Sequence, residues 1–101
     1  MDIKELTQRM DEFVKSKGWY ESSSTRPQCA RNLAISLNLE ASEVLEHFQW
    51  TEQAADQQGL AGELADVALY LLQLARVSGI DLEQAVLAKL AINHTRNWDE
   101  N

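Results

Sequence analysis

The spacing of apolar residues along the chain predicts four helices. In four segments, apolar side chains recur at three- and four-residue steps, which is the period of an α-helix with one face turned to a core. These segments are 3–17, 29–50, 60–78 and 81–96. The polar stretches 18–28 and 51–58 are typical of connections. We therefore expect an all-α fold, arranged like a four-helix bundle with short connections.

Residues that begin and end helices support the first, third and last of these segments. Asp2 and Asp81 stand where a side chain can cap the first turn of a helix. Gly18 and Gly79 stand where a helix commonly ends. The segment 60–78 is apolar nearly all round, so we expect it at the centre of the fold or at an interface between subunits.

Composition narrows the classes of function. A chain of 101 residues suits one compact domain, 1–101. Its formal net charge of −7 argues against nucleic-acid binding, which calls for a basic face. A single cysteine, Cys29, excludes an internal disulfide and favours a reducing compartment. The longest apolar run, 67–72, is too short to span a bilayer. We expect a cytoplasmic protein without nucleic-acid or membrane partners.

Two acidic pairs on consecutive predicted helices indicate a metal site. They are Glu40 with Glu43, and Glu63 with Asp66. Glu63 falls on the apolar face of its helix, with no Lys or Arg three or four residues away. An uncompensated carboxylate in such a place is costly unless a cation binds it. Oxygen ligands without a cysteine favour Mg²⁺, with Mn²⁺ as a possible substitute.

A di-iron or di-manganese carboxylate site is a competing interpretation, because such bundles carry Glu-x-x-His with a spacing of three. This spacing is missing, since His47 follows Glu43 by four residues and His94 has Ala91 three residues before it. We therefore exclude that kind of site. His47 itself is interpreted as a hydrogen-bonded residue at the edge of the core, outside the site.

The last predicted helix places Lys89, Asn93 and Arg96 on one face. One interpretation is a helix that leaves the core, with cations favoured near its C-terminal end. The other is a set of donors that bind phosphate oxygens. Beside an acidic metal cluster, the second interpretation is favoured.

The acidic pairs also carry a family resemblance. The sequence resembles the E-x-x-E…E-x-x-D signature of the MazG-like nucleotide pyrophosphohydrolases. It reads Glu40-Ala-Ser-Glu43, then nineteen residues, then Glu63-Leu-Ala-Asp66. Arg31-Asn32-Leu33 and Phe48-Gln49-Trp50 are similar to the dCTPase-like branch, and the resemblance covers nearly the whole chain. It implies hydrolysis of (deoxy)nucleoside triphosphates between the α- and β-phosphates, giving monophosphate and pyrophosphate. The implied biological role is housecleaning of the dNTP pool.

The resemblance also implies roles for individual residues. The four acids would hold Mg²⁺, and one of them would orient or deprotonate the attacking water. The remaining residues would bind the nucleotide: Lys89 and Arg96 the phosphates, Trp19, Trp50 and Asn93 the base or sugar, and Arg31 and Tyr70 further parts of the substrate. Two positions depart from the family pattern, namely Gly62, where many relatives have Glu, and the ending Arg96-Asn97-Trp98.

The resemblance implies an oligomer whose sites combine residues of several subunits, with a homotetramer favoured and a dimer next. Two alternatives stay open. One is a non-catalytic helical module that binds a protein partner. The other is a phosphoribosyl-ATP pyrophosphohydrolase with the same fold. A preference for a pyrimidine such as cytosine rests mainly on the resemblance.

Overall fold

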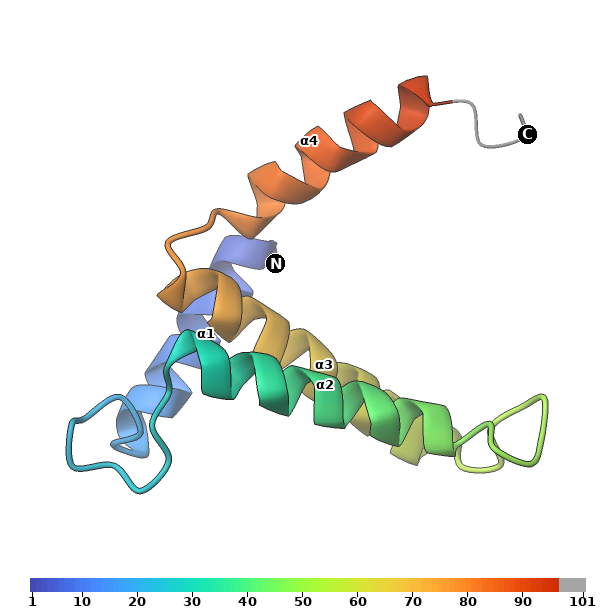
Figure 1. The fold of residues 1–101 in the computed structure, drawn as a ribbon, viewed down its shortest axis with the longest axis horizontal. Coiled ribbons are helices and arrows are strands. Elements are labelled where there is room, and N and C mark those ends of the chain that lie inside the picture. The colour runs from blue at the N-terminus through green and yellow to red at the C-terminus, as the bar shows by residue number, and fades with distance from the viewer. Residues whose placement is uncertain (97–101) are drawn as a thin grey trace.

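The computed structural model describes residues 1–96, which form four helices. They are α1 (Ile3–Ser16), α2 (Ala30–Glu46), α3 (Gln57–Val77) and α4 (Leu82–Thr95). No strand occurs within this range, which confirms the predicted all-α class. In Figure 1, α2 and α3 run antiparallel side by side, α1 crosses them at one end, and α4 projects away from the other three. None of the described helices is long and apolar enough to cross a membrane.

The predicted caps begin two of the helices. Asp2 Oδ1 accepts the backbone N–H of Glu5 at 2.9 Å, and Asp81 Oδ1 accepts that of Gln84 at 3.1 Å. Such bonds satisfy N–H groups that have no partner within the helix. Gly18 and Gly79 both have φ of +69°, a left-handed conformation that glycine adopts without steric cost. A glycine next to each helix end therefore determines where α1 and α3 stop.

The connection between α2 and α3 differs from its prediction at both ends. The predicted end of α2 at residue 50 is wrong, because the helix stops at Glu46 and the chain tightens into turns there. The predicted start of α3 at residue 60 is also wrong, because Asp56 Oδ1 accepts the N–H of Gly59 at 2.9 Å and starts the helix at residue 57. A Cβ on Gly59 would lie 2.4 Å from Asp56 Oδ2, so this cap requires glycine.

The buried core lies where α1 crosses α3. Met10 and Val14 of α1 pack against Leu72 of α3, and all three are buried. Partly buried side chains close the edges of this cluster: Ile3, Trp19, Tyr20 and Leu82. On α2, Leu33 is the fully buried side chain. Because Trp19 and Tyr20 pack against this cluster, the crossing of α1 over α3 positions the connection in which they lie.

The fourth helix leaves the rest of the chain soon after it starts. Among residues 1–96 it contacts α1 and α3 but not α2, and none of its residues is buried. Leu87, Leu90 and Ile92 are each more than half exposed. The chain exposes 7980 Å² of surface, whereas a compact monomer of its mass would expose about 5,800 Å². A single copy therefore leaves apolar surface uncovered.

Candidate active site

The antiparallel pairing of α2 with α3 brings the four acids together. Oε2 of Glu40 is covered and has no hydrogen-bond partner within residues 1–96. The pKa of Glu40 is raised, first because burial removes water from the carboxyl, then because Glu43 lies beside it, and last because of the charges of Asp66 and Glu63. Each of these acids therefore acts on Glu40 electrostatically.

Glu63 has a direct partner that the sequence analysis left outside the site. The imidazole Nε2 of His47, at the end of α2, contacts Oε2 of Glu63. A Cβ on Gly59 would lie 3.2 Å from Cε1 of His47, so the glycine also leaves room for the ring. The two residues are sixteen positions apart, and only the turn that ends α2 at Glu46 brings them together. No periodic pattern in the sequence signals this contact.

The acidic cluster fits a hard divalent cation in its chemistry. Four carboxylates without a thiolate are the donors that Mg²⁺ prefers, and the unpartnered oxygen of Glu40 is an atom that a cation would satisfy. As the side chains stand, no three His, Cys, Asp or Glu residues of the described range are arranged to hold an ion together. In this arrangement one oxygen of Glu63 contacts His47.

A pocket adjoins the acidic cluster along α3. Its volume is about 490 Å³, and it lies between α1, α3 and the connection that follows α1. Three predicted site residues line it together: Trp19, Asp66 and Tyr70. Asp66 thus borders the pocket, and Glu63 lies one helical turn before it on α3.

The remaining walls of this pocket were missed by sequence reasoning. They consist of apolar residues of α1 and α3 together with four polar ones, which are Arg9, Arg26, Gln28 and Gln73. Arg9 and Gln73 fit ordinary solvated or boundary positions on their helices, and Arg26 and Gln28 lie in a polar connection, so nothing in the sequence marked them. The guanidinium of Arg26 lies 5.5 Å from the ring centre of Trp19, and Phe13 meets the same ring edge-on at 5.6 Å. The indole is therefore held by a cation–π contact and an edge-on aromatic contact.

Other predicted site residues lie elsewhere in the single chain. Trp50 is 87% exposed in the connection between α2 and α3, and Arg31 is exposed on α2. Lys89, Asn93 and Arg96 lie on or just after α4, which does not contact α2. The structure therefore joins the acids to Trp19 and Tyr70. It does not join them to the predicted phosphate-binding set within one copy.

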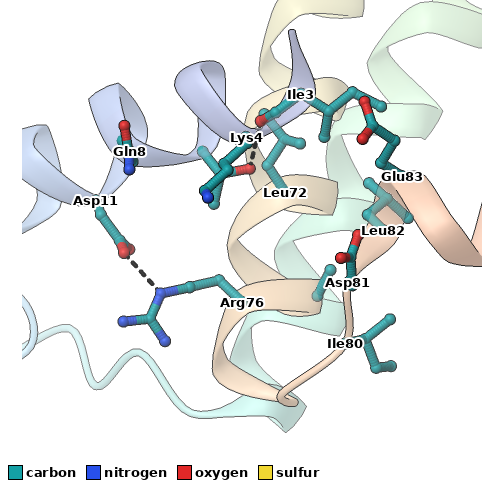
Figure 2. Close-up of a pocket in the computed structure, with 12 residues that line it drawn as sticks. Ile3, Lys4, Gln8, Asp11, Leu72, Arg76, Ile80, Asp81, Leu82 and Glu83 are labelled. Atoms are coloured by element: carbon teal, nitrogen blue, oxygen red, sulfur yellow. Dashed lines mark hydrogen bonds and ion pairs between the residues drawn. The ribbon is translucent and has the colours of Figure 1, made fainter.

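A polar network lies on the far side of the α1–α3 crossing. Asp11 of α1 accepts from the hydroxyl of Tyr20 and from Nε of Arg76, each at 2.8 Å. Burial, followed by this bond and the negative charge of Asp11, raises the pKa of Tyr20 to about 12. Figure 2 shows Asp11 pointing from α1 to Arg76 on α3, at the border of a second cavity of about 370 Å³ that extends to the start of α4. The network ties the connection after α1 to α3.

Comparison with known proteins identifies the family. The model of the MazG-like family matches residues 35–101, well over half of the chain, and this range includes both acidic pairs. The chain belongs to the MazG-like family. This result confirms the resemblance that the spacing of the acids indicated.

The MazG-like chain is similar to a solved pyrophosphatase from Archaeoglobus fulgidus, with a TM-score of 0.78 and 32% sequence identity over 96% of this chain and 92% of that one. It is 36% identical over 94 residues to human dCTP pyrophosphatase 1, in an alignment of 84% of this chain and 52% of the human protein. A shorter stretch of 38 residues is 55% identical to a dATP/dGTP diphosphohydrolase of Salmonella phage PMBT28. The chain spans about half the length of the dCTP pyrophosphatase.

Proposed function

We propose that this protein hydrolyses deoxynucleoside triphosphates between the α- and β-phosphates, releasing the nucleoside monophosphate and pyrophosphate. The observation that carries the proposal is the adjacency of two sites on α3. A pocket with an aromatic wall, suited to a flat base, shares Asp66 with a cluster of four carboxylates. The names of the relatives, a dCTP pyrophosphatase and a dATP/dGTP diphosphohydrolase, support the same reaction.

In this proposal Glu40, Glu43, Glu63 and Asp66 hold Mg²⁺, for which Mn²⁺ can substitute. When bound, the ion neutralises charge on the triphosphate and polarises its phosphoryl oxygens. The residues of the chain then have separate tasks. Trp19 and Tyr70 bind the base and sugar in the pocket, and one carboxylate of the cluster orients the attacking water or takes its proton.

The proposal assigns the phosphate-binding residues to a second copy of the chain. Lys89, Asn93 and Arg96 are the predicted donors, but α4 does not contact α2 in the same copy. The exposed apolar residues of α4 give a reason for association, as does the large exposed surface. We propose a homo-oligomer, a tetramer first and a dimer next, in which α4 of one copy approaches the acids of another. Trp50 of the α2–α3 connection and Arg31 of α2 would reach the substrate by the same association. The expected location of the protein is the cytoplasm, where dNTP pools are kept.

The experiment that tests the function is pyrophosphate release from a panel of dNTPs and NTPs, with Mg²⁺, with Mn²⁺ and with EDTA. Glu63→Gln is the test variant, because it keeps the shape of the side chain and removes its charge. Glu52→Gln, in the exposed connection between α2 and α3, is the matched control. We expect metal-dependent release that persists in the control and falls by at least a hundredfold, about 3 kcal/mol of barrier, in Glu63→Gln.

The same panel separates the alternatives. A non-catalytic helical module would release no pyrophosphate from any nucleotide and would tolerate Glu63→Gln. A phosphoribosyl-ATP pyrophosphohydrolase would act on that substrate and leave the dNTPs untouched. Trp19→Ala separates them further, since loss of a base-stacking ring costs about 1–3 kcal/mol of binding to a nucleotide, whereas a protein-binding module has no use for the pocket.

A further inference from the structure

A buried amide lies at the wall of the nucleotide pocket. Gln73 of α3 lines the pocket and is only 4% exposed. Its Nε2 donates to Oε1 of Gln28 at 2.5 Å, and Nε2 of Gln28 donates in turn to the backbone carbonyl of Arg26 at 2.7 Å. A polar group so deeply buried in a largely apolar wall needs partners for each of its atoms. The first of these bonds accounts for one N–H of Gln73, and the second holds Gln28 in place.

The hydrogen bonds behind the pocket fix which way this amide faces. Nε2 of Gln28 donates to the backbone carbonyl of Arg26, so Oε1 of Gln28 is the atom turned toward Gln73. An amide oxygen accepts, so the group of Gln73 that faces it is Nε2. The carbonyl oxygen of Gln73 is the group that remains for the pocket.

The depth of Gln73 decides which part of a base meets it. Gln28, its neighbour, is only half-buried, so Gln73 marks the deeper end. When the triphosphate lies beside Asp66 and the other acids, the base is the part of the nucleotide that extends into the pocket. The edge of the base opposite the sugar then lies deepest. That edge carries an amino group in cytosine and adenine, and a carbonyl oxygen in uracil, thymine and guanine. A fixed acceptor attracts the amino group and repels the carbonyl.

We propose that Gln73 is a specificity-determining residue, whose side-chain carbonyl accepts a hydrogen bond from the exocyclic amino group of cytosine or adenine. The proposal rests on the proposed function of the pocket. An orientation fixed by hydrogen bonds before the ligand arrives makes rejection of the wrong group strong, because the wrong base leaves a buried acceptor unpaired.

The test is equilibrium binding of nucleoside monophosphates, which needs no hydrolysis. Two pairs exchange the amino group for a carbonyl, which also turns the ring nitrogen beside it from an acceptor into an N–H: dCMP against dUMP, and dAMP against dIMP. By calorimetry the wild-type protein should bind the amino member of each pair about tenfold more tightly. Gln73→Met keeps the length of the side chain and removes the acceptor, so the ratio should fall to about one. Gln8→Met, at the other cavity on α1, should keep the wild-type ratio.

The outcomes separate a specificity role from a purely structural one. If Gln73 only tied the connection after α1 to α3, then Gln73→Met would weaken all four monophosphates equally, and this result would overturn the proposal. A wild-type protein that prefers the carbonyl members, or shows no preference, would overturn it too. Should Gln73→Met not fold, Gln28→Met removes the acceptor that orients the amide of Gln73, and the ratio should fall there.

The proposed function can fail separately from this inference. Selective binding of the amino members without pyrophosphate release from any triphosphate would refute the proposed reaction and leave the assignment of Gln73 standing. Pyrophosphate release with equal binding of all four monophosphates would refute the assignment of Gln73 and leave the proposed reaction standing. No binding of any nucleotide would refute both.

Discussion

The imidazole of His47, at the C-terminal end of α2, contacts the carboxylate of Glu63, in the first half of α3. The sequence places no Lys or Arg near Glu63 along its own helix, and the structure supplies an imidazole from the neighbouring helix instead. The ring is largely covered, as is the carboxylate. Such a partner holds one oxygen of a carboxylate and leaves the other for a ligand, which is how neighbours of metal ligands commonly act.

We predict that His47→Ala weakens Mg²⁺ binding by about 10- to 100-fold, because Glu63 loses the group that orients it. The midpoint of a Mg²⁺ titration, followed by melting temperature, measures this without any substrate. His94→Ala, on the exposed last turn of α4, is the control. Tighter Mg²⁺ binding in His47→Ala would contradict the prediction and show that the imidazole keeps Glu63 away from the metal.

The raised pKa of Glu40 predicts how the metal-free protein responds to pH. A carboxyl whose pKa is raised on folding stabilises the protein fully below its unfolded-state pKa, about 4.3, and this contribution is lost as the pH rises through the folded-state value. In EDTA, melting temperature should therefore fall from mildly acid to neutral pH. Glu40→Gln should flatten that fall, melt above the wild-type protein at neutral pH, and gain less from added Mg²⁺. A parallel pH dependence in the two proteins would refute this explanation.

A second titration concerns Tyr20, whose pKa is raised to about 12 by burial and by its bond to Asp11. The folded protein favours the neutral phenol, so the stabilisation is complete below the ordinary tyrosine pKa of about 10 and is lost between there and about 12. We expect an ultraviolet titration to show one tyrosine that ionises near the upper value, and Tyr20→Phe to remove it. An ordinary titration of both tyrosines would contradict the structure.

Asp11 should matter to stability more than to chemistry. It accepts two hydrogen bonds that link α1 to the following connection and to α3. Asp11→Ala should lower the free energy of unfolding by about 1–3 kcal/mol, because the hydroxyl of Tyr20 is left without its partner. Tyr20→Phe should cost about 1 kcal/mol, since it removes only one of the two bonds. Urea unfolding measures both, and an equal loss in the two variants would show that the Arg76 bond contributes nothing.

The sequence predicted the features of the fold that depend on residues close together along the chain. Asp2 and Asp81 cap helices through bonds that span three residues, and the apolar period predicted all four helices. Asp56 is also a local cap, but the stretch 51–58 around it has no large apolar residue to show a helical period, so the start of α3 was placed too late. The end of α2 was placed too late for a similar reason, since Phe48 and Trp50 continue the apolar pattern into a turn.

The site could be predicted only in part, because its walls come from distant segments. The acids share two helices and a regular spacing, so their pattern was visible. Gln28 and Gln73 are 45 positions apart, and His47 meets Glu63 across a turn. Each of these residues looks ordinary in its own segment. The crossing of α1 over α3 brings Gln28 and Gln73 to one pocket, and the pairing of α2 with α3 brings His47 to Glu63. Neither arrangement follows from the helical period.

The departure of α4 leads to the last prediction, which concerns sites shared between copies. Lys89→Ala and Glu63→Gln should each be inactive alone, the first for want of a phosphate-binding cation and the second for want of a metal ligand. If α4 of one copy completes the site of another, co-expression of the two variants creates some sites with both residues intact. Random pairing in a dimer would then restore about a quarter of the wild-type activity.

Leu90→Asp provides the matching structural test, because Leu90 is an exposed apolar residue of α4 one position from Lys89. It should dissociate the oligomer, as seen by analytical ultracentrifugation, and abolish pyrophosphate release although both the acids and Lys89 are present. Recovery of no activity in the mixed variants, together with an active monomeric Leu90→Asp protein, would place every residue of the site in one copy. The lysine on α4 would then serve only the end of its own helix.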